Sequence, residues 1–523
     1  MSWRSTRAAG RTAEGNRQVA VIDLGSNSWR LVVYTYAPGD WWKRTDELYE
    51  TVRIGAGMGA SGRLSDEPMQ RGLETLSVFE RFCRANGLAP RDVHVIATSA
   101  IREALNREEF LRRARASTGL EIEVLSERDE AFYGYVAAVN TSTLRDGVVL
   151  ELGGGSMQLI QVADRRAGRL ASFGLGAVSL TERFLPGSGP AKKKELQRVR
   201  EFVRQTLADP TWLERSGDRL VGMGGAVRNL AAAVQERDLP SLDLGVQGFV
   251  ITADALDELV QMLASMPVDE RGQVPGIKPG RGDIILAAAL VLRTVIELGK
   301  WGGIEATEAG LREGVFLART LLADRDEPLF EDVRQAAVRN LAIQYESDLA
   351  HVEHVARLAL QMHDSLVAGG LFEPRPGERE LLWVASMLHD VGMTISYDDH
   401  HKHSRYLIES AELPGFDPRE RALIAQISRY HRKGTPKLGE MAPLSEDGDE
   451  ELLDRCAVIL RLAEHLERGR DQSVSEARLR ANGKGVDLHL EAAGDLTLPR
   501  WSVDRYGDDE AFQRVFGRRL LIG

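Results

Sequence analysis

Two stretches of the chain share one pattern of apolar and polar positions. Residues 19–33 and 147–160 each begin with an apolar, β-branched run, pass through an acidic residue into a short Gly/Ser turn, and end in a second apolar run. The pattern predicts strand, loop, strand in both places. Either copy alone is more typical of an ordinary β-hairpin turn. The acid stands at the same offset in both copies, however, and this pairing favours two phosphate-binding loops.

The residue types of these loops suit an anion. Glycines let backbone N–H groups approach a ligand closely, and serines add hydroxyl donors. Asp23 and Glu151, at the ends of the preceding strands, are candidate ligands of Mg²⁺ beside a bound phosphate. The candidate phosphate-binding residues are Gly25, Ser26, Asn27 and Ser28 in the first loop, and Gly153, Gly154, Gly155 and Ser156 in the second. We expect the two loops to face each other across a cleft.

Helical spacing of apolar positions predicts a helix over residues 66–86, after a strand over 43–54. Residues 92–106 and 121–139 each predict a short strand followed by a helix, the first opening at Thr98-Ser99 and the second at Ser126. A helix N-terminus is an anion site.

Two polar residues, Arg102 and Glu130, follow these helix starts. Arg102 is explained equally well by anion binding and by an ordinary capped helix with an exposed arginine. Acids in a first helical turn, such as Glu127, Asp129 and Glu130, are often only complements of the helix dipole. The pattern alone therefore assigns neither residue a role.

Composition narrows the class of protein. A chain of 523 residues needs several domains, and 43% hydrophobic with 28% charged residues is typical of a globular protein without membrane spans. The first 17 residues lack the apolar segment of a secretory signal and predict a disordered tail. The two cysteines, Cys83 and Cys456, lie in separate helical patterns, which indicates reduced thiols and a cytoplasmic location. A net charge of −11 argues against a nucleic-acid partner, so a polyanionic substrate needs a local basic pocket.

Histidines are concentrated in the last third of the chain. Of eleven, only His94 precedes residue 350, and the region that follows has helical patterning to about residue 470. Imidazole and carboxylate are ligand types for divalent metals. His351 and the pair His389-Asp390 are therefore a candidate metal-ligand set, and the same helical region also carries His431.

Taken in order, VAVIDLGSNSWRLVV, VIATSAIREALN, LSERDEAFYGYVAAV and VVLELGGGSMQLI resemble the exopolyphosphatase / guanosine pentaphosphate phosphohydrolase (Ppx/GppA) family. The resemblance continues through RLVGMGGAVRNLAA, GRGDIILAAALVL and EAGLREGVF, and covers nearly all of the chain from residue 18. It implies an α/β, two-lobed, actin-like (ribonuclease H-like) ATPase-type core, then an all-α domain resembling HD-type phosphohydrolases and a small α/β appendage. The expected boundaries are a tail at 1–17, core subdomains at 18–140 and 141–325, the HD-like domain at 326–470 and the appendage at 471–523.

The resemblance also implies a reaction, the release of terminal phosphate from inorganic polyphosphate or pppGpp. Glu130 would act as general base on water, Asp23 and Glu151 would hold Mg²⁺, the loops would cradle the phosphoryl group, and Arg102 would neutralise charge. The family tendency implies a homodimer. Two alternatives stay open: a non-catalytic polyphosphate or alarmone sensor, and a kinase-like ATPase if Gly222 to Gly225 form an adenosine pocket.

Two departures from the family pattern bear on activity. The second loop carries Glu151 and Gln158 where the family has Asp and Glu, which lengthens one metal ligand and removes one charge. Where HD proteins keep a final metal-binding Asp, this chain has Glu464 and Glu467. The HD-like region is therefore either a functional site for a second divalent metal or a retained fold whose histidines serve packing or polyanion binding.

Overall fold

The computed structural model describes residues 15–522 except Ala208, Pro210, Ser241, Asp243, Gly507 and Asp508. The tail expected at 1–17 lies outside the described residues up to residue 14, while Arg17 already begins the first strand. The chain forms two compact units. The first contains residues 15–237 and Phe249–Glu331, and the second contains Asp238–Gly248 and the chain from Asp332 onward. Within the described part, no helix combines the length and apolar character needed to cross a bilayer.

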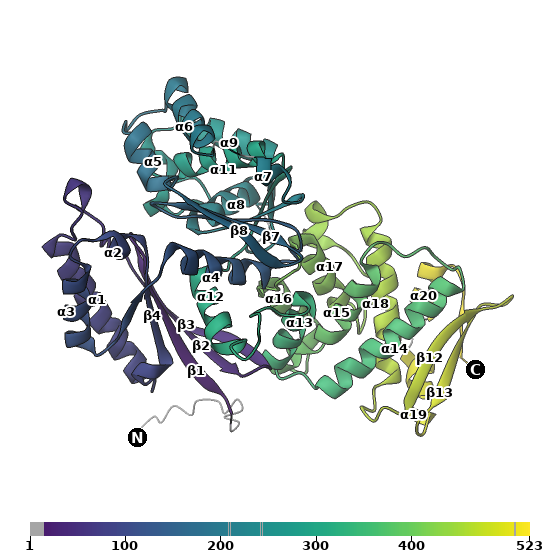
Figure 1. Cartoon of the computed structure of the whole chain (residues 1–523). Helices are drawn as coiled ribbons and strands as arrows, with labels where there is room; N and C mark the ends of the chain where they lie inside the picture. The colour runs from purple at the N-terminus through teal and green to yellow at the C-terminus, as the bar shows by residue number, and fades with distance from the viewer. Residues whose placement is uncertain are drawn as a thin grey trace, which may run out of the picture. The chain divides into compact units, whose positions relative to one another are not determined.

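The first unit contains two sheets (Figure 1), and their strand orders match. The first sheet has the order β3-β2-β1-β4-β5, with β1 Arg17–Leu24, β2 Trp29–Ala37, β3 Trp41–Glu50, β4 Val93–Ala97 and β5 Ile122–Val124. The second has the order β10-β11-β9-β6-β7-β8, with β6 Gly147–Leu152, β7 Met157–Ala163, β8 Arg166–Phe173, β9 Arg219–Met223, β10 Val250–Thr252 and β11 Gly303–Ala306. In each sheet three strands form an antiparallel meander, and the first strand of the meander pairs in parallel with a later strand.

Strand β1 shows how the sheets are covered by helices. Its alternate residues Ala20, Ile22 and Leu24 join one buried cluster, and Val19 and Val21 join another, as the twofold alternation of a strand requires. The first cluster includes buried residues of α1 (Asp66–Ala85) and α3 (Arg107–Thr118), and the second includes those of α4 (Glu127–Val139) and α12 (Leu311–Phe316). A central strand covered on both faces explains the nearly continuous apolar run of its sequence.

Helix α2 (Ser99–Glu103) follows β4 of the first sheet. The remaining helices of the first unit follow strands of the second sheet: α5 Ala177–Phe184, α6 Lys193–Thr206, α7 Thr211–Glu214, α8 Gly225–Asp238, α9 Ala253–Ser265, α10 Val268–Arg271 and α11 Ile285–Gly299. Helix α12 follows them in sequence but packs against α4 and β1. The expected assignment of all of 141–325 to the second lobe therefore differs from the structure, because the chain returns to the first sheet at its end.

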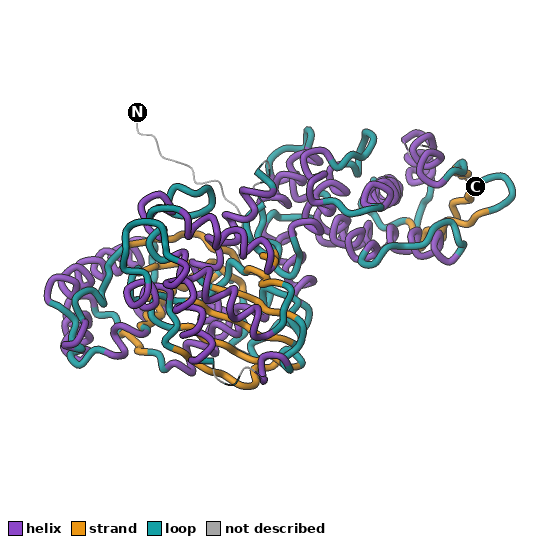
Figure 2. Tube along the Cα trace, turned by 90° about the horizontal axis from the view of Figure 1, so that it is seen from above, coloured by secondary structure: helices purple, strands orange, loops and turns teal. Residues whose placement is uncertain are grey.

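The second unit is mainly helical, as Figure 2 shows, with strands near the C-terminus. Its helices are α13 Val333–Gln344, α14 Leu349–Ala368, α15 Glu378–Leu388, α16 His400–Ser410, α17 Pro418–Arg429, α18 Asp449–Leu466, α19 Thr497–Tyr506 and α20 Asp509–Phe516. Strands β12 Val474–Ala481, β13 Val486–Ala492 and β14 Leu520–Ile522 form its sheet. Leu479 and Leu488 of this sheet belong to the same buried cluster as the helices, so the strands expected as a separate appendage share the helices' core.

One segment joins the second unit from far upstream. Leu242 and Leu244 pack with Ala422 and Met441, which accounts for the grouping of Asp238–Gly248 with this unit. The sequence carried no signal for this contact, because two leucines in a loop have no periodicity. The two-lobed α/β core and the helical C-terminal region expected from the sequence are confirmed; the likeness of that region to HD domains remains a prediction.

Candidate active site

A cavity of about 200 Å³ in the first unit brings together carboxylates from three segments. Asp23, Glu130 and Glu151 all line it. Four arginines line it as well: Arg30, Arg228, Arg281 and Arg312. A cavity that alternates carboxylates with guanidinium groups offers ligands for a cation and for a polyanion at the same place. The chain is acidic overall, but this cavity supplies the local basic pocket that a polyanionic substrate needs.

The topology explains why Asp23 and Glu151 meet. Each is the last residue but one of the corresponding strand, Asp23 in β1 and Glu151 in β6. Each of these strands pairs in parallel with the next strand of its lobe, β4 or β9. Ligands of open α/β sheets bind at the carboxyl ends of such strands. The shared offset of the two acids in the sequence thus reflects equivalent positions in two similar sheets.

Asp23 is held by an arginine from the other end of the unit. Arg312 Nη1 lies 3.2 Å from Asp23 Oδ2, and both side chains are largely buried. Burial raises the pKa of Asp23, although the positive charge of Arg312 opposes that shift. Glu313, next to Arg312, caps helix α12 by accepting a hydrogen bond from Gly310 N and also accepts one from the Tyr34 hydroxyl. Helix α12 is therefore fixed so that Arg312 points at Asp23.

Glu151 has an unsatisfied oxygen. Its Oε2 is buried and has no hydrogen-bond partner among the described residues. Burial, followed by repulsion from Glu130 and Asp23, raises its pKa to about 8. A Cβ at Gly134 would lie 2.8 Å from this oxygen, so only glycine lets helix α4 pass so close. A divalent cation at this point would give the oxygen a partner and relieve the crowding of negative charge, so the residues present fit Mg²⁺.

The three carboxylates surround the cavity without forming a closed cage. Among the described residues, the groups of three or more His, Cys, Asp or Glu whose donor atoms lie within 4.8 Å of one another are both in the second unit. In the first unit, Asp23 and Glu151 would therefore leave most coordination positions to water and substrate. Mg²⁺ is usually bound in this way, by one or two carboxylates with phosphate oxygens and water.

Glu130 and Arg102 form a pair. Ser126 Oγ accepts a hydrogen bond from Asp129 N at 3.1 Å and so begins helix α4, as predicted, with Glu130 in its first turn. Arg102 Nη1 donates to Glu130 Oε2 at 2.7 Å and to the Leu125 carbonyl at 3.0 Å. Burial raises the pKa of Glu130, although this hydrogen bond with Arg102 opposes the shift. Arg102 is not part of the cavity lining, so in this structure it orients Glu130, and the guanidinium groups open to a ligand are the four lining arginines.

The first glycine loop is only partly directed at the cavity. Gly25 and Ser28 line it. Ser26 Oγ instead lies 2.7 Å from Ser99 Oγ and accepts a hydrogen bond from Ala100 N, so it provides the cap of helix α2 that the sequence assigned to Thr98-Ser99. Asn27 is exposed, and its carbonyl accepts a hydrogen bond from Arg53 N.

In the second loop, Gly153 lines the cavity, and its N–H donates to the Ser156 carbonyl at 2.9 Å, which closes the turn. The carbonyls of Gly154 and Gly155 accept hydrogen bonds from Val178 N and Gly176 N at the start of helix α5. Gly154, Gly155 and Ser156 thus shape the loop, and Gly153 is its member at the cavity.

A third loop completes the cavity. Gly224, Gly225 and Ala226, where β9 passes into α8, line it. Gly224 has a φ of 100°, and a Cβ there would lie 2.7 Å from the Leu152 carbonyl oxygen. Glycine is therefore required for the chain to turn against β6 and direct the N-terminus of α8 at the cavity, where it adds an anion-binding end. Gly222 is instead packed inside the sheet against Ile304.

The sequence did not identify the cavity arginines. Burial, followed by repulsion from Arg312, lowers the pKa of Arg228 to about 10, and burial also lowers the pKa of Arg281. Such crowding of guanidinium groups costs free energy that a bound polyanion would offset. A usable signal did exist, because each of four stretches quoted above contains one of these arginines at or beside its glycine-rich or acidic turn.

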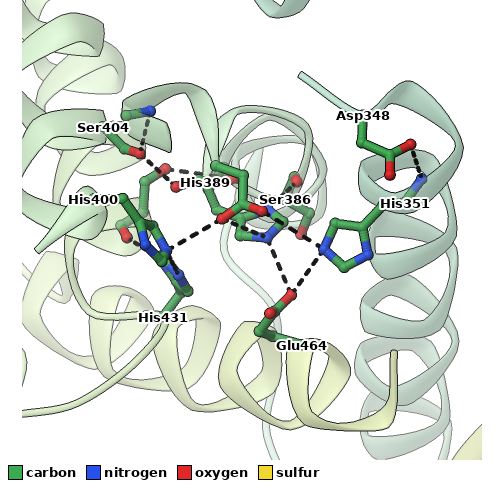
Figure 3. A network of polar contacts seen from close by, with 12 residues as sticks. Asp348, His351, Ser386, His389, His400, Ser404, His431 and Glu464 are labelled. Atoms are coloured by element: carbon green, nitrogen blue, oxygen red, sulfur yellow. Dashed lines mark hydrogen bonds and ion pairs between the residues drawn. The ribbon is translucent and has the colours of Figure 1, made fainter. Parts of the chain in front are cut away.

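A second polar cluster lies in the second unit, as Figure 3 shows, where His389 and Glu464 are between His351 on one side and His400 with His431 on the other. We name this set, His351, His389, Asp390, His400, His431 and Glu464, the histidine cluster. The predicted ligands His351, His389 and Asp390 do converge, with donor atoms within 4.8 Å of one another. Glu464 Oε2 lies 3.2 Å from Nε2 of both His351 and His389.

The two alternative glutamates have different surroundings. Glu467 lies outside the histidine cluster, with Oε2 at 3.5 Å from His354 Nε2. Of the two glutamates, Glu464 is therefore the one that contacts the predicted ligands His351 and His389. His400 and His431, which form a second set with Asp390, were not among the predicted ligands.

Comparison with known proteins agrees with this geometry. The model of the Ppx/GppA phosphatase family matches residues 39–323, and that of Ppx/GppA phosphatase domain III matches residues 333–498. A guanosine-5'-triphosphate,3'-diphosphate pyrophosphatase of Vibrio vulnificus is 28% identical over 477 residues, 90% of this chain and 92% of the relative. The protein of the same name from Vibrio campbellii is 27% identical over 493 residues, 93% of this chain and 95% of the relative.

Solved structures give the same assignment. The Aquifex aeolicus member of the Ppx/GppA protein family has a TM-score of 0.52 at 26% identity, covering 60% of this chain and all of that one. An exopolyphosphatase from Cytophaga hutchinsonii has a TM-score of 0.53 at 21% identity, covering 58% of this chain and 97% of that one, which is a likeness of fold. The family model spans more than half of the chain and includes every carboxylate of the cavity except Asp23. The chain is therefore a hydrolase of the Ppx/GppA phosphatase family.

Proposed function

We propose that the cavity of the first unit hydrolyses the terminal phosphoanhydride of pppGpp, with inorganic polyphosphate as a second substrate. The observation that carries the proposal is the meeting of Asp23, Glu130 and Glu151 with four arginines in one cavity. The names of the Vibrio relatives, which match about nine tenths of the chain, favour pppGpp. Polyphosphate presents the same terminal anhydride.

In this proposal Glu130 accepts a proton from the attacking water. A carboxylate whose pKa is raised by burial is a better base near neutral pH than an exposed one. The hydrogen bond from Arg102 fixes the orientation of its carboxylate, which matters because a base must lie within hydrogen-bonding distance of the proton it takes. The water oxygen bonds to the terminal phosphorus, and the anhydride oxygen leaves on the remaining phosphate.

Charge neutralisation falls to the arginines and to the two strand-end acids. Arg30, Arg228 and Arg281 would contact phosphate oxygens, and the N-terminus of α8 would add backbone N–H groups. Asp23 and Glu151 would hold Mg²⁺, which when bound supplies positive charge to the transferred phosphoryl group. Arg312 would exchange part of its contact with Asp23 for the substrate.

One observation favours a second candidate, a sensor that binds the polyanion without turnover. Glu151 and Gln158 are direct cross-strand partners, and Gln158 Oε1 is also buried without a hydrogen-bond partner among the described residues. An amide at this place contributes no charge to a metal site. Because the pKa of Glu151 is raised to about 8, Mg²⁺ would bind weakly. The cavity would then still bind the polyanion but would hydrolyse it slowly.

Phosphate release from pppGpp, long-chain polyphosphate and ATP with Mg²⁺ tests the proposal. We expect Glu130→Gln to lower release from the preferred substrate by roughly 100-fold or more while binding is retained. Glu127→Gln is the matched control, because Glu127 lies one turn earlier on the same helix and is exposed. Binding of pppGpp without release by the unmutated chain would instead establish the sensor.

A further inference from the structure

The cavity of the first unit is too small for all of the substrate proposed for it. Its volume is about 200 Å³, below the range of about 300–1,000 Å³ that is usual for pockets enclosing a small molecule. The terminal phosphates can therefore lie inside the cavity, whereas guanosine must lie at its rim. Among the described residues that line the cavity none is aromatic, so the lining itself offers no surface on which a base could stack.

A row of three residues leads from the cavity to its rim. Asp23 of β1 lies opposite Arg30 of β2, and Arg30 lies opposite Tyr49 of β3. Side chains opposite each other in antiparallel strands project from the same face of the sheet. Adjacent strands are about 4.8 Å apart, so the backbone of Tyr49 is two strand spacings, about 10 Å, from that of Asp23. Asp23 and Arg30 line the cavity, and the row continues beyond the lining to Tyr49 on the edge strand.

The ring of Tyr49 is held beside a cavity arginine. The guanidinium carbon of Arg30 lies over this ring, 4.9 Å from its centre, in a cation–π contact. Arg30 Nη1 in turn lies 3.1 Å from Glu47 Oε1. Strand β3 therefore supplies both the ring and the carboxylate that fix the guanidinium group.

The hydroxyl group of Tyr49 is fixed as well. Thr51 Oγ1 donates a hydrogen bond to it at 3.3 Å. This bond is the first cause that lowers the pKa of Tyr49, followed by a hydrogen bond with Ser28 and by two positive charges, although partial burial opposes the shift. The two charges belong to Arg281 and Arg30. Ser28 and both arginines line the cavity, so the hydroxyl end of the ring lies next to the cavity opening.

Tyr49 is nevertheless accessible, with 48% of its surface exposed. An exposed tyrosine on an edge strand is ordinary by itself, because aromatic residues favour strands. Here, however, contacts with Arg30 and Thr51 fix the ring at the place where a nucleoside would leave the cavity. A fixed, accessible aromatic ring beside arginines is a stacking surface for a base.

We propose that Tyr49 is the residue that recognises the base of the nucleotide: the guanine of pppGpp stacks on its ring while the triphosphate runs along the row through Arg30 to Asp23. This inference rests on the proposed function of the cavity. Polyphosphate has no base and gains nothing from the ring, so Tyr49 makes the site selective for nucleoside triphosphates over polyphosphate. Stacking tolerates differences elsewhere in the nucleotide, so GTP gains as much from the ring as pppGpp does.

Calorimetric titration of the full chain with pppGpp, GTP and tripolyphosphate in the presence of Mg²⁺ tests the inference. Every protein carries Glu130→Gln, so that the ligands stay intact. We expect Tyr49→Ala to weaken binding of pppGpp and GTP roughly tenfold and to change that of tripolyphosphate by less than about twofold. Tyr49→Phe should keep the affinity for all three ligands, because the ring remains. The matched control is Tyr406→Ala, which removes a tyrosine of the second unit that is 64% exposed.

Three results would overturn the inference. Unchanged affinity for pppGpp and GTP in Tyr49→Ala would show that the base does not contact the ring. Equal weakening for tripolyphosphate would show that Tyr49 acts only by positioning Arg30. Equal losses in Tyr49→Phe and Tyr49→Ala would assign the effect to the hydroxyl group.

Two further measurements keep these results unambiguous. Thermal unfolding of Tyr49→Ala and of Tyr49→Leu, which keeps most of the bulk without the aromatic ring, separates lost stacking from lost fold. Hydrolysis of pppGpp by the unmutated chain, together with unchanged affinity in Tyr49→Ala, would overturn the inference alone. A chain that neither binds nor hydrolyses pppGpp would overturn the proposed function as well.

Discussion

The cavities of the two units combine acidic and basic side chains in two different ways. The first brings three carboxylates together with four arginines, and the second brings two carboxylates and three imidazoles together with three arginines and a lysine. Oxygen ligands prefer Mg²⁺, whereas imidazoles prefer transition metals. The difference therefore gives the two cavities different sets of candidate metal ligands within one chain.

The two sites also differ in how their groups are held in place. In the first unit the acids are fixed by side-chain pairs, Arg102 with Glu130 and Arg312 with Asp23. In the histidine cluster three of the four imidazoles, those of His389, His400 and His431, are fixed by the backbone carbonyl three residues earlier. Side-chain pairs can be removed by a single substitution, while backbone acceptors cannot. The first site should therefore be much more sensitive to changes in neighbouring residues.

The largest effect that tests this separation is expected for Asp23→Asn. The amide keeps the shape of the side chain but removes the charge that faces Arg312 and Mg²⁺, so phosphate release should fall on the order of 100-fold or more. Asp46→Asn, an exposed position on edge strand β3, is the matched control. Unchanged phosphate release in Asp23→Asn would show that Asp23 takes no part in the reaction.

Much of the first cavity was predictable because its signals are local. The strands around Asp23 and Glu151 alternate or run continuously apolar, and the glycine turns that follow them are recognisable within a few residues. The helix expected at 66–86 is α1, and the helix predicted to start at Ser126 is α4. The strand expected at 43–54 is β3, shifted toward the N-terminus.

The partners of these acids were not predictable, because they come from distant parts of the chain. Arg312 is 289 residues from Asp23, and only the return of α12 to the first sheet brings them together. His431 is 80 residues from His351, and no local pattern shows that Asp390 faces both. In the same way, the capping role of Ser26 depends on the contact between the first loop and helix α2.

A smaller effect, of about tenfold, is expected for Arg102→Ala and would sharpen the contrast in how the groups are held. Arg102 contacts Glu130 but does not line the cavity, so its loss should lower kcat and leave KM within about twofold. Arg281→Ala, which removes a lining guanidinium, should instead raise KM. Arg102→Lys should restore part of kcat, since a lysine also donates to a carboxylate. A rise in KM for Arg102→Ala at constant kcat would show that Arg102 binds substrate directly.

The smallest effect concerns the proton on Glu151, a carboxylate of the first unit. The pKa of Glu151 is about 8 in the folded chain, well above its ordinary value near 4.5. Between these pH values the unfolded chain loses a proton that the folded chain keeps, so the free energy of unfolding falls as pH rises through this range and levels off above pH 8. Glu151→Gln lacks this group. With EDTA present, the Tm of the variant should therefore exceed that of the unmutated chain by a few degrees more at pH 8.5 than at pH 5. An equal difference at both pH values would mean that Glu151 titrates normally, and that Asp23, Glu130 and Glu151 lie too far apart to share one cation.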